Sequence, residues 1–229
     1  MKKTISIHSL VLFIVFLPLY GFSQNLETFH KTAQKKNTAN AWNDLAEHLY
    51  DKRENPALLK EATQYAIELA LKDGDNQELA RAYIYASDLL WQEGSIEEYM
   101  STNKKALDIL KDSENHSLKE VALNNVATAF GEQDRIDSLI YYVNKAVELN
   151  SKYDGTKQNL GYEYQNLAYA YSIKGIVDSS IYYTQKTIDA LQLAKDTLPL
   201  LDAYNQMAVV YVKNKNYPKA LNYFNEALE

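Results

Sequence analysis

The sequence predicts an all-α fold, a right-handed α-solenoid of about five antiparallel helical hairpins. Two recurring positions carry this prediction. A small residue or threonine returns at spacings of 40, 40, 41 and 40 residues: Ala66, Ala106, Ala146, Thr187 and Ala227. A bulky residue upstream returns at spacings of 41, 40, 41 and 40: Trp42, Tyr83, Leu123, Tyr164 and Tyr204. Such self-similarity is typical of stacked repeats, in which each unit buries its apolar face against its neighbours. Only 7 glycines and 4 prolines occur in 229 residues, which suits helices joined by short turns.

The last repeat shows most clearly why each unit reads as a helical hairpin. The first apolar stripe follows helical spacing, with offsets of 0, 3, 4 and 7: Tyr204, Met207, Ala208 and Tyr211. A polar break over 213–218 follows, and Pro218 is compatible with the first position of a second helix. The second stripe comprises Ala220, Leu221, Phe224, Ala227 and Leu228.

The other four units repeat this pattern in order along the chain. Their first stripes begin Trp42, Leu45, Ala46; then Tyr83, Ala86, Ser87; then Leu123, Val126, Ala127; then Tyr164, Leu167, Ala168. The small third member of each set is expected where the two helices of a hairpin approach most closely. A larger side chain there would overpack the core, at a cost of about 1–3 kcal/mol.

These stripes resemble the tetratricopeptide repeat (TPR) family, with units near 38–77, 78–117, 118–158, 159–198 and 199–229. The units depart from the family's usual 34 residues, and the excess predicts second helices longer by about a turn and longer connections between units. Ser180 and Leu139 replace the family's alanine at the start of second helices. Asp137 and Asp178 are expected to cap the second helices of units three and four.

The resemblance implies a concave groove lined by the first helices, in which a peptide or partner protein lies. Groove positions fall one, five and eight residues after each bulky opener. The partner-binding residues expected from this rule are Asn43, Glu47, Ile84, Asp88, Trp91, Asn124, Thr128, Gln165, Tyr169 and Asn205. The same rule places Tyr50, Gly131, Ser172, Val209 and Val212 in the groove.

Two features of this groove leave alternatives open. Asn or Gln follows the opener in four units, and such amides either grip an extended backbone or are simply solvated. Trp91 either anchors a ligand or packs under the turn at Gly94. The groove positions hold no lysine, so the clamp for a terminal carboxylate found in some family members is not expected.

The N-terminus indicates export. Lys2 and Lys3 precede an apolar run over 10–20, and Gly21-Phe22-Ser23 offers a cleavage site after Ser23. The interpretation is a signal peptide over 1–23, with an uncleaved anchor as the alternative, followed by a leading arm or short helix over 24–37. An exported chain without cysteine is expected in the periplasm.

The net charge and the absence of catalytic and metal-binding motifs restrict the possible functions. Cleavage after Ser23 leaves 22 basic and 30 acidic residues, a net charge of −8, which argues against nucleic acid as a partner. His30, His48 and His116 are isolated, and Asp73-Gly74-Asp75-Asn76 reads as a turn and not as a calcium loop. We therefore expect no enzyme activity, no metal and no cofactor.

Two functions follow as expectations. The first is a periplasmic scaffold that binds a protein or peptide. The second is the sensory region of a longer membrane-bound signalling protein, a histidine kinase or transcription regulator. This expectation rests on resemblance, because exported arrays with units of this length resemble the sensor regions at the front of such proteins. Leu221, Phe224 and Leu228 would be exposed at the end of the array, which favours a continuation of the chain or self-association.

Overall fold

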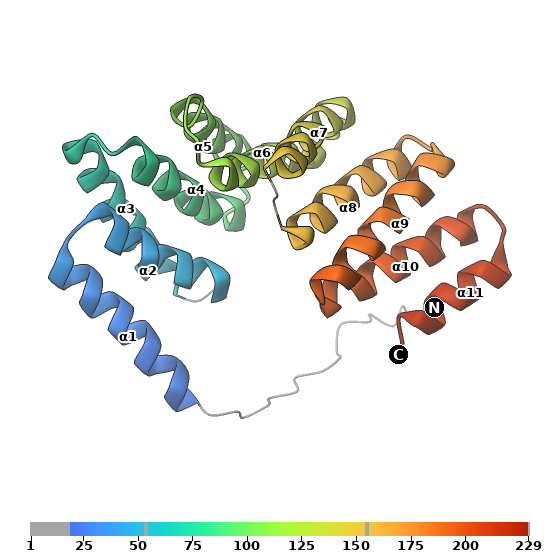
Figure 1. The fold of residues 1–229 in the computed structure, drawn as a ribbon, viewed down its shortest axis with the longest axis horizontal. Coiled ribbons are helices and arrows are strands. Elements are labelled where there is room, and N and C mark those ends of the chain that lie inside the picture. Colours follow the sequence, from blue (N-terminus) through green and yellow to red (C-terminus); the bar gives the residue numbers. More distant parts are fainter. Residues whose placement is uncertain (1–18, 53–54, 154–155, 229) are drawn as a thin grey trace, which may run out of the picture.

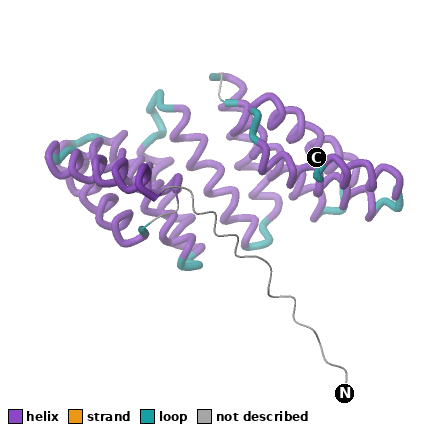
Figure 2. The backbone as a smooth tube through the Cα atoms, turned by 90° about the horizontal axis from the view of Figure 1, so that it is seen from below, coloured by secondary structure: helices purple, strands orange, loops and turns teal. Residues whose placement is uncertain are grey.

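The computed structural model describes residues 19–52, 55–153 and 156–228, and all regular secondary structure in these ranges is helical. The helices stack side by side into an arc, with the blue N-terminal and red C-terminal helices at its two ends (Figure 1). Figure 2, turned by 90°, shows the same helices joined by short loops. The predicted all-α solenoid of helical hairpins is confirmed.

A leading helix, α1 (Leu19–Lys36), precedes five hairpins. The hairpins are α2 (Ala39–Lys52) with α3 (Pro56–Asp73), α4 (Asn76–Gln92) with α5 (Ile96–Ile109), α6 (His116–Glu132) with α7 (Ile136–Lys152), α8 (Lys157–Ile173) with α9 (Val177–Ala194), and α10 (Thr197–Lys213) with α11 (Tyr217–Glu226). Helix α1 covers most of 24–37, where the sequence left a leading arm or a short helix open, and it begins at Leu19, so that the predicted boundary at Ser23 falls inside it. None of the helices described is long and apolar enough to cross a membrane.

The small residues of the repeat pack as expected. The five at the close approach within each hairpin are completely buried: Ala46, Ser87, Ala127, Ala168 and Ala208. Of the five that define the repeat in the second helices, four are equally buried, namely Ala66, Ala106, Ala146 and Thr187. Ser180 also fits the core, because its hydroxyl donates to the Ala168 carbonyl at 3.1 Å. Small side chains thus let neighbouring helices come close enough to bury a continuous core.

The additional length of each unit is distributed differently from the prediction. Second helices of 17 or 18 residues occur in three units, but α5 has 14 and α11 has 10. The first helices α4, α6, α8 and α10 each have 17 residues, but α2 has 14, so both helices of a hairpin are long only in units three and four. The connection from α5 to α6 spans 110–115, whereas α3 and α4 are separated only by Gly74 and Asp75. Long connections are therefore not general.

The two residues that connect α3 and α4 make this short connection possible. Gly74 adopts φ +69° and ends α3, a left-handed conformation that glycine enters without steric cost. The Asp75 carboxylate accepts hydrogen bonds from the backbone N–H groups of Gln77 and Glu78 and so caps α4. The acidic segment 73–76 is a turn between units, as the sequence indicated.

The capping prediction for Asp137 and Asp178 is wrong. The cap positions of α7 and α9 are Arg135 and Ile176, and neither makes a side-chain capping bond. Both aspartates lie inside the first turn, where a negative charge favours the helix dipole. Asp137 instead accepts a bond from Lys174 Nζ at 2.5 Å, which links unit three to unit four.

The packing order places one layer of helices inside the arc and one outside. Besides its hairpin partner, each of α2, α4 and α6 contacts the first helix of the following unit. The first helices therefore line the inner side of the arc, while α3, α5 and α7 lie along its outer edge (Figure 1). The inner layer is the surface to which the sequence assigned partner binding.

Candidate functional site

A cavity of about 800 Å³ opens on the inner surface of the arc. Its lining comes from five helices: Tyr50 of α2; Asp88, Trp91 and Gln92 of α4; Tyr99 of α5; Thr128 of α6; and Tyr162 of α8. Four of these seven residues are aromatic and one, Asp88, carries a formal charge. The volume lies within the range of about 300–1,000 Å³ that is usual for ligand sites.

Trp91 is held firmly at this cavity. Its ring lies 5.1 Å from the Tyr99 ring between centroids, at an interplanar angle of 51°. Its carbonyl accepts the Gly94 N–H at 3.0 Å within the turn that ends α4. The ring is half-buried, so one part packs on Tyr99 and another part faces the cavity. Trp91 therefore combines a packing contact on Tyr99 with a side that faces the cavity.

Polar groups beside the rings are fixed by neighbours on the same helices. Gln92 Nε2 donates to Asp88 Oδ2 at 2.5 Å, and the Thr128 hydroxyl donates to the Asn124 carbonyl at 2.9 Å. Tyr99 is 6% exposed, and burial, together with the nearby Tyr50 and Asp88, raises the pKa of its phenol. Tyr99 therefore remains a neutral hydroxyl throughout the physiological range.

A charged network lies between units one and two and is connected to Tyr50 of the cavity lining through the ring of Tyr85. Arg81 Nη1 lies 3.0 Å from Asp44 and 3.5 Å from Glu78, and Nη2 bonds Glu47. Burial opposes the charge of Arg81, but hydrogen bonds and charge interactions with Tyr85 and Glu47 outweigh it and raise the guanidinium pKa. One cation thus faces three carboxylates, and the inner surface here is acidic.

The structure brings four of the predicted groove positions together, Tyr50, Asp88, Trp91 and Thr128. Two others are misassigned. Asn43 is completely buried, and its Nδ2 donates to Glu78 Oε2 at 2.7 Å and to the Glu78 carbonyl at 2.8 Å. Ile84 is 1% exposed and packs with Ala106 and Leu110. Asn43 is turned toward Glu78 of the next unit, and Ile84 is in a core cluster shared by its own unit and Ala122 of the next, so neither is open to a partner.

The remaining predicted residues are spread along the inner layer. Glu47 pairs with Arg81, and Asn124 Nδ2 contacts Glu163 Oε1 at 3.4 Å. Tyr169 and Asn205 are exposed, and Gln165 is half-buried. Because Asn43 and Asn124 are bonded to glutamates of the following unit, these two amides act between units and do not form a continuous ladder toward a ligand.

The sequence rule missed three lining residues, Gln92, Tyr99 and Tyr162. Tyr99 belongs to a second helix, and Tyr162 lies two residues before its unit's opener, so both fall outside a rule built on positions after the opener. A signal was nevertheless present in the 19 tyrosines of the chain. Stacking brings tyrosines of neighbouring units onto the same face, which spacing within one unit does not reveal.

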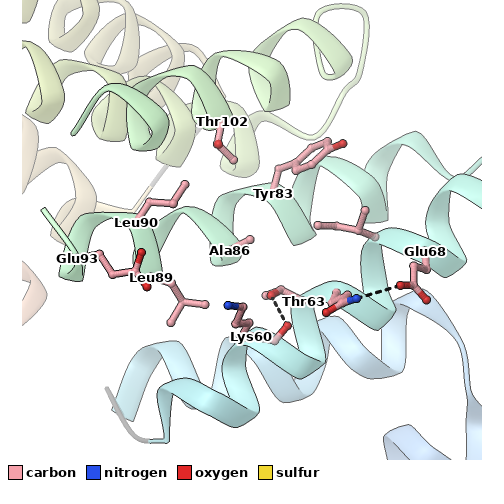
Figure 3. Close-up of a pocket in the computed structure, with 11 residues that line it drawn as sticks. Lys60, Thr63, Glu68, Tyr83, Ala86, Leu89, Leu90, Glu93 and Thr102 are labelled. Atoms are coloured by element: carbon pink, nitrogen blue, oxygen red, sulfur yellow. Dashed lines mark hydrogen bonds between the residues drawn. The ribbon is translucent and has the colours of Figure 1, made fainter. Parts of the chain in front are cut away.

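A second pocket, of about 450 Å³, lies between α3 and α5 with α4 as its floor. In Figure 3, Leu89, Leu90 and Ala86 extend from α4, between Lys60 and Thr63 of α3 and Thr102 of α5. The Ala86 position holds Leu45, Val126, Leu167 and Met207 in the other units, and all four are at most 1% exposed. The pocket therefore exists where one unit lacks the apolar side chain that fills the others.

Within the described parts of the chain, no group of three or more His, Asp or Glu side chains is placed to hold a metal ion. The inner cavity contains three tyrosines, a tryptophan, one aspartate, one amide and a threonine. The arrangement is suited to holding a ligand by ring contacts and hydrogen bonds.

Comparison with known proteins defines the class of fold. No protein-family model and no curated protein sequence matches the chain. Solved structures do match. BtubC (BKLC) from P. vanneervenii superposes with a TM-score of 0.68 at 20% identity, over 91% of this chain and 87% of that chain.

Two further structures extend this likeness. YrrB, described as a TPR protein with an unusual peptide-binding site, gives a TM-score of 0.54 at 20% identity, over 89% of this chain and 92% of its own. A Rap protein in complex with Competence and Sporulation Factor gives 0.73 at 15% identity, over 93% of this chain and 59% of its own. At these identities the likeness establishes the fold alone, which is a TPR-type helical solenoid.

Proposed function

We propose that this chain is a non-enzymatic scaffold that binds a peptide or an extended segment of a partner protein along its inner surface. The observation that carries the proposal is the 800 Å³ cavity, which joins residues of units one to four on the side where the first helices form a continuous layer. YrrB and the Rap protein, both similar in fold, are described with a peptide-binding site and with a bound factor, respectively. An extended segment fits a surface that crosses several helices.

The test begins with a library of random twelve-residue peptides selected on the immobilised protein. Enriched peptides are then measured by fluorescence anisotropy against Trp91→Ala and the matched control Tyr141→Ala. Tyr141 is an aromatic residue, 54% exposed, on the second helix α7. We expect Trp91→Ala to weaken binding by roughly tenfold or more, as for a buried aromatic anchor, and Tyr141→Ala to leave it unchanged. Equal affinity of both variants, or no enriched peptide, contradicts the proposal.

We further propose that the scaffold acts in the periplasm, on the grounds of the basic, apolar and small-residue segments over 1–23, most of which lie outside the described residues. The test is expression of the chain with its own N-terminus in a Gram-negative host, followed by fractionation and mass spectrometry. We expect a periplasmic product that begins at Gln24. A product that remains in the cytoplasm with residues 1–23 attached contradicts this proposal.

A further inference from the structure

The chemistry of the inner cavity points to the kind of side chain it receives. We propose that the cavity binds the cationic side chain of a lysine or arginine in the bound segment, with the charge beside Asp88 and over the ring of Trp91. This inference rests on the proposed peptide-binding function and specifies its ligand.

The first step is the aromatic lining. Tyr50, Trp91, Tyr99 and Tyr162 surround the cavity from four different helices. The face of an aromatic ring attracts a cation within about 6 Å, most strongly for tryptophan. Within the described residues, no lysine or arginine of the chain lies over Trp91 or Tyr99, whereas Arg135 and Lys104 lie over Phe130 at 4.4 and 5.0 Å. The part of the Trp91 ring that faces the cavity is therefore not occupied by a cation from the described part of the chain.

The second step is charge. Asp88 is the one lining residue with a formal charge, and none of the seven is basic. Its carboxylate is half-buried and held by Gln92, so it is oriented before a ligand arrives. A fixed carboxylate beside rings in a partly enclosed space favours a cation and disfavours an anion.

The third step is the surrounding field. The network of Arg81 sets one cation against Asp44, Glu47 and Glu78, and it reaches the cavity residue Tyr50 through the ring of Tyr85, so the excess negative charge lies one ring away from the lining. The predicted groove positions in all five units hold no lysine or arginine. An acidic ligand segment would meet repulsion here, whereas a basic one would be attracted on approach and in the bound state.

The experiment uses the peptides enriched by library selection on the whole chain. In each, the lysine or arginine is replaced by norleucine, which keeps the aliphatic stem and removes the charge. Both peptides are titrated against the native protein, Asp88→Asn, and the control Asp189→Asn. Asp189 of α9 also bonds a glutamine four residues away, Gln185, but it lies outside the cavity. Circular dichroism verifies the fold of each variant.

We expect norleucine to weaken binding to the native protein by roughly tenfold. Asp88→Asn should weaken binding of the basic peptide by several-fold but change little for the norleucine peptide, because the two charges act as a pair. Asp189→Asn should behave as the native protein does. Should Asp88→Asn fail to fold, Trp91→Leu replaces it, with the same expected coupling.

Other outcomes separate the two proposals. One outcome is that peptides bind and lose affinity with Trp91→Ala, but tolerate norleucine. This outcome overturns the inference and leaves the proposed function standing. Additive effects of norleucine and Asp88→Asn also overturn the inference, since they show that the two groups do not interact. Failure to enrich any peptide overturns both.

Discussion

At the scale of single residues, Ala86 shows how one substitution in a repeat creates a pocket. The position holds a buried leucine, valine or methionine in the other four units, so the neighbouring helices are spaced for a larger group. In unit two, Ile67, Leu89 and Leu90 are consequently only half-buried around the gap. The vacancy leaves apolar surface in contact with water.

Ala86→Leu is expected to stabilise the protein. The added atoms enter existing space and cover exposed apolar surface, so we expect about 1 kcal/mol of additional unfolding free energy in urea. Ala57→Leu, at an exposed site near the start of α3, serves as the control and should change stability by less than about 0.5 kcal/mol. A loss of stability in Ala86→Leu would show that the space is not available to the side chain.

Glu163 is a second residue whose environment is unusual. Its side chain is completely buried, and the facing Glu120 is 3% exposed. Burial and the charge of Glu120 raise the pKa of Glu163 to about 8, while Asn124 partly offsets the shift. Burial also raises the pKa of Glu120, against hydrogen bonds from Asn159, Asn150 and Glu163. The two carboxyl groups between α6 and α8 therefore retain a proton at neutral pH.

This pair predicts a pH-dependent stability. The folded-state pKa of Glu163 lies above its unfolded value of 4.5, so its contribution is fully present below pH 4.5 and is lost as pH rises through about 8. Glu163→Gln should remove much of this fall and raise stability at pH 8 by about 1–3 kcal/mol. Urea unfolding at pH 5 and pH 8 measures the difference. The exposed Glu132→Gln should retain the native pH dependence, and an identical profile for Glu163→Gln would contradict the assignment.

At the scale of elements, the helix termini show which sequence signals are dependable. Asp75 caps α4 because the turn leaves it immediately before the first helical residue. Asp137 and Asp178 are also aspartates, but each is the second residue of its helix and therefore lies within the first turn. A cap depends on the position where the backbone enters the helix, and a shift of one or two residues removes its hydrogen bonds.

Two alanine substitutions test this distinction. Asp75→Ala should cost about 1 kcal/mol, because it leaves two backbone N–H groups of α4 without their partner. Asp178→Ala should cost less than about 0.5 kcal/mol, since only a dipole interaction is lost. Thermal and urea unfolding of both variants provides the comparison. Equal costs would mean that the cap at Asp75 adds nothing beyond charge.

At the scale of the whole molecule, each hairpin packs mainly against its neighbours, so stability is shared unequally along the array. Helices α2 to α10 each have a neighbouring helix on both sides. Helix α11, with 10 residues, packs against α10 and exposes Leu221 and Leu228 at 60% and 85%. The predicted exposure of this apolar face is confirmed for the chain as described.

The rates of amide hydrogen exchange should follow this unequal distribution of stability along the array. In this chain, amides of α11 should exchange fastest among helices α2 to α11, and those of α6 and α7 slowest, because opening α11 breaks one helix interface and opening α6 breaks several. Mass spectrometry of peptic fragments measures the rates. Comparable protection of α11 and α6 would indicate that the array opens as a single cooperative unit, or that α11 is covered by a second copy.

The sequence alone determined the fold class, the number of hairpins and the close contacts, because these depend on residue size at a fixed period. Ala46 and Ala127 must be small in any arrangement of the units, because each lies at the close contact between the two helices of its own hairpin. Which of the predicted groove residues face the inner surface became apparent only from the packing of the folded chain. One rule placed all five in the groove, but Asn43 and Ile84, one residue after their openers, are buried, whereas Asp88, Trp91 and Thr128, five or eight residues after theirs, line the cavity. A cavity formed by five helices depends on how units rotate against each other, and spacing within one unit carries no information about that rotation.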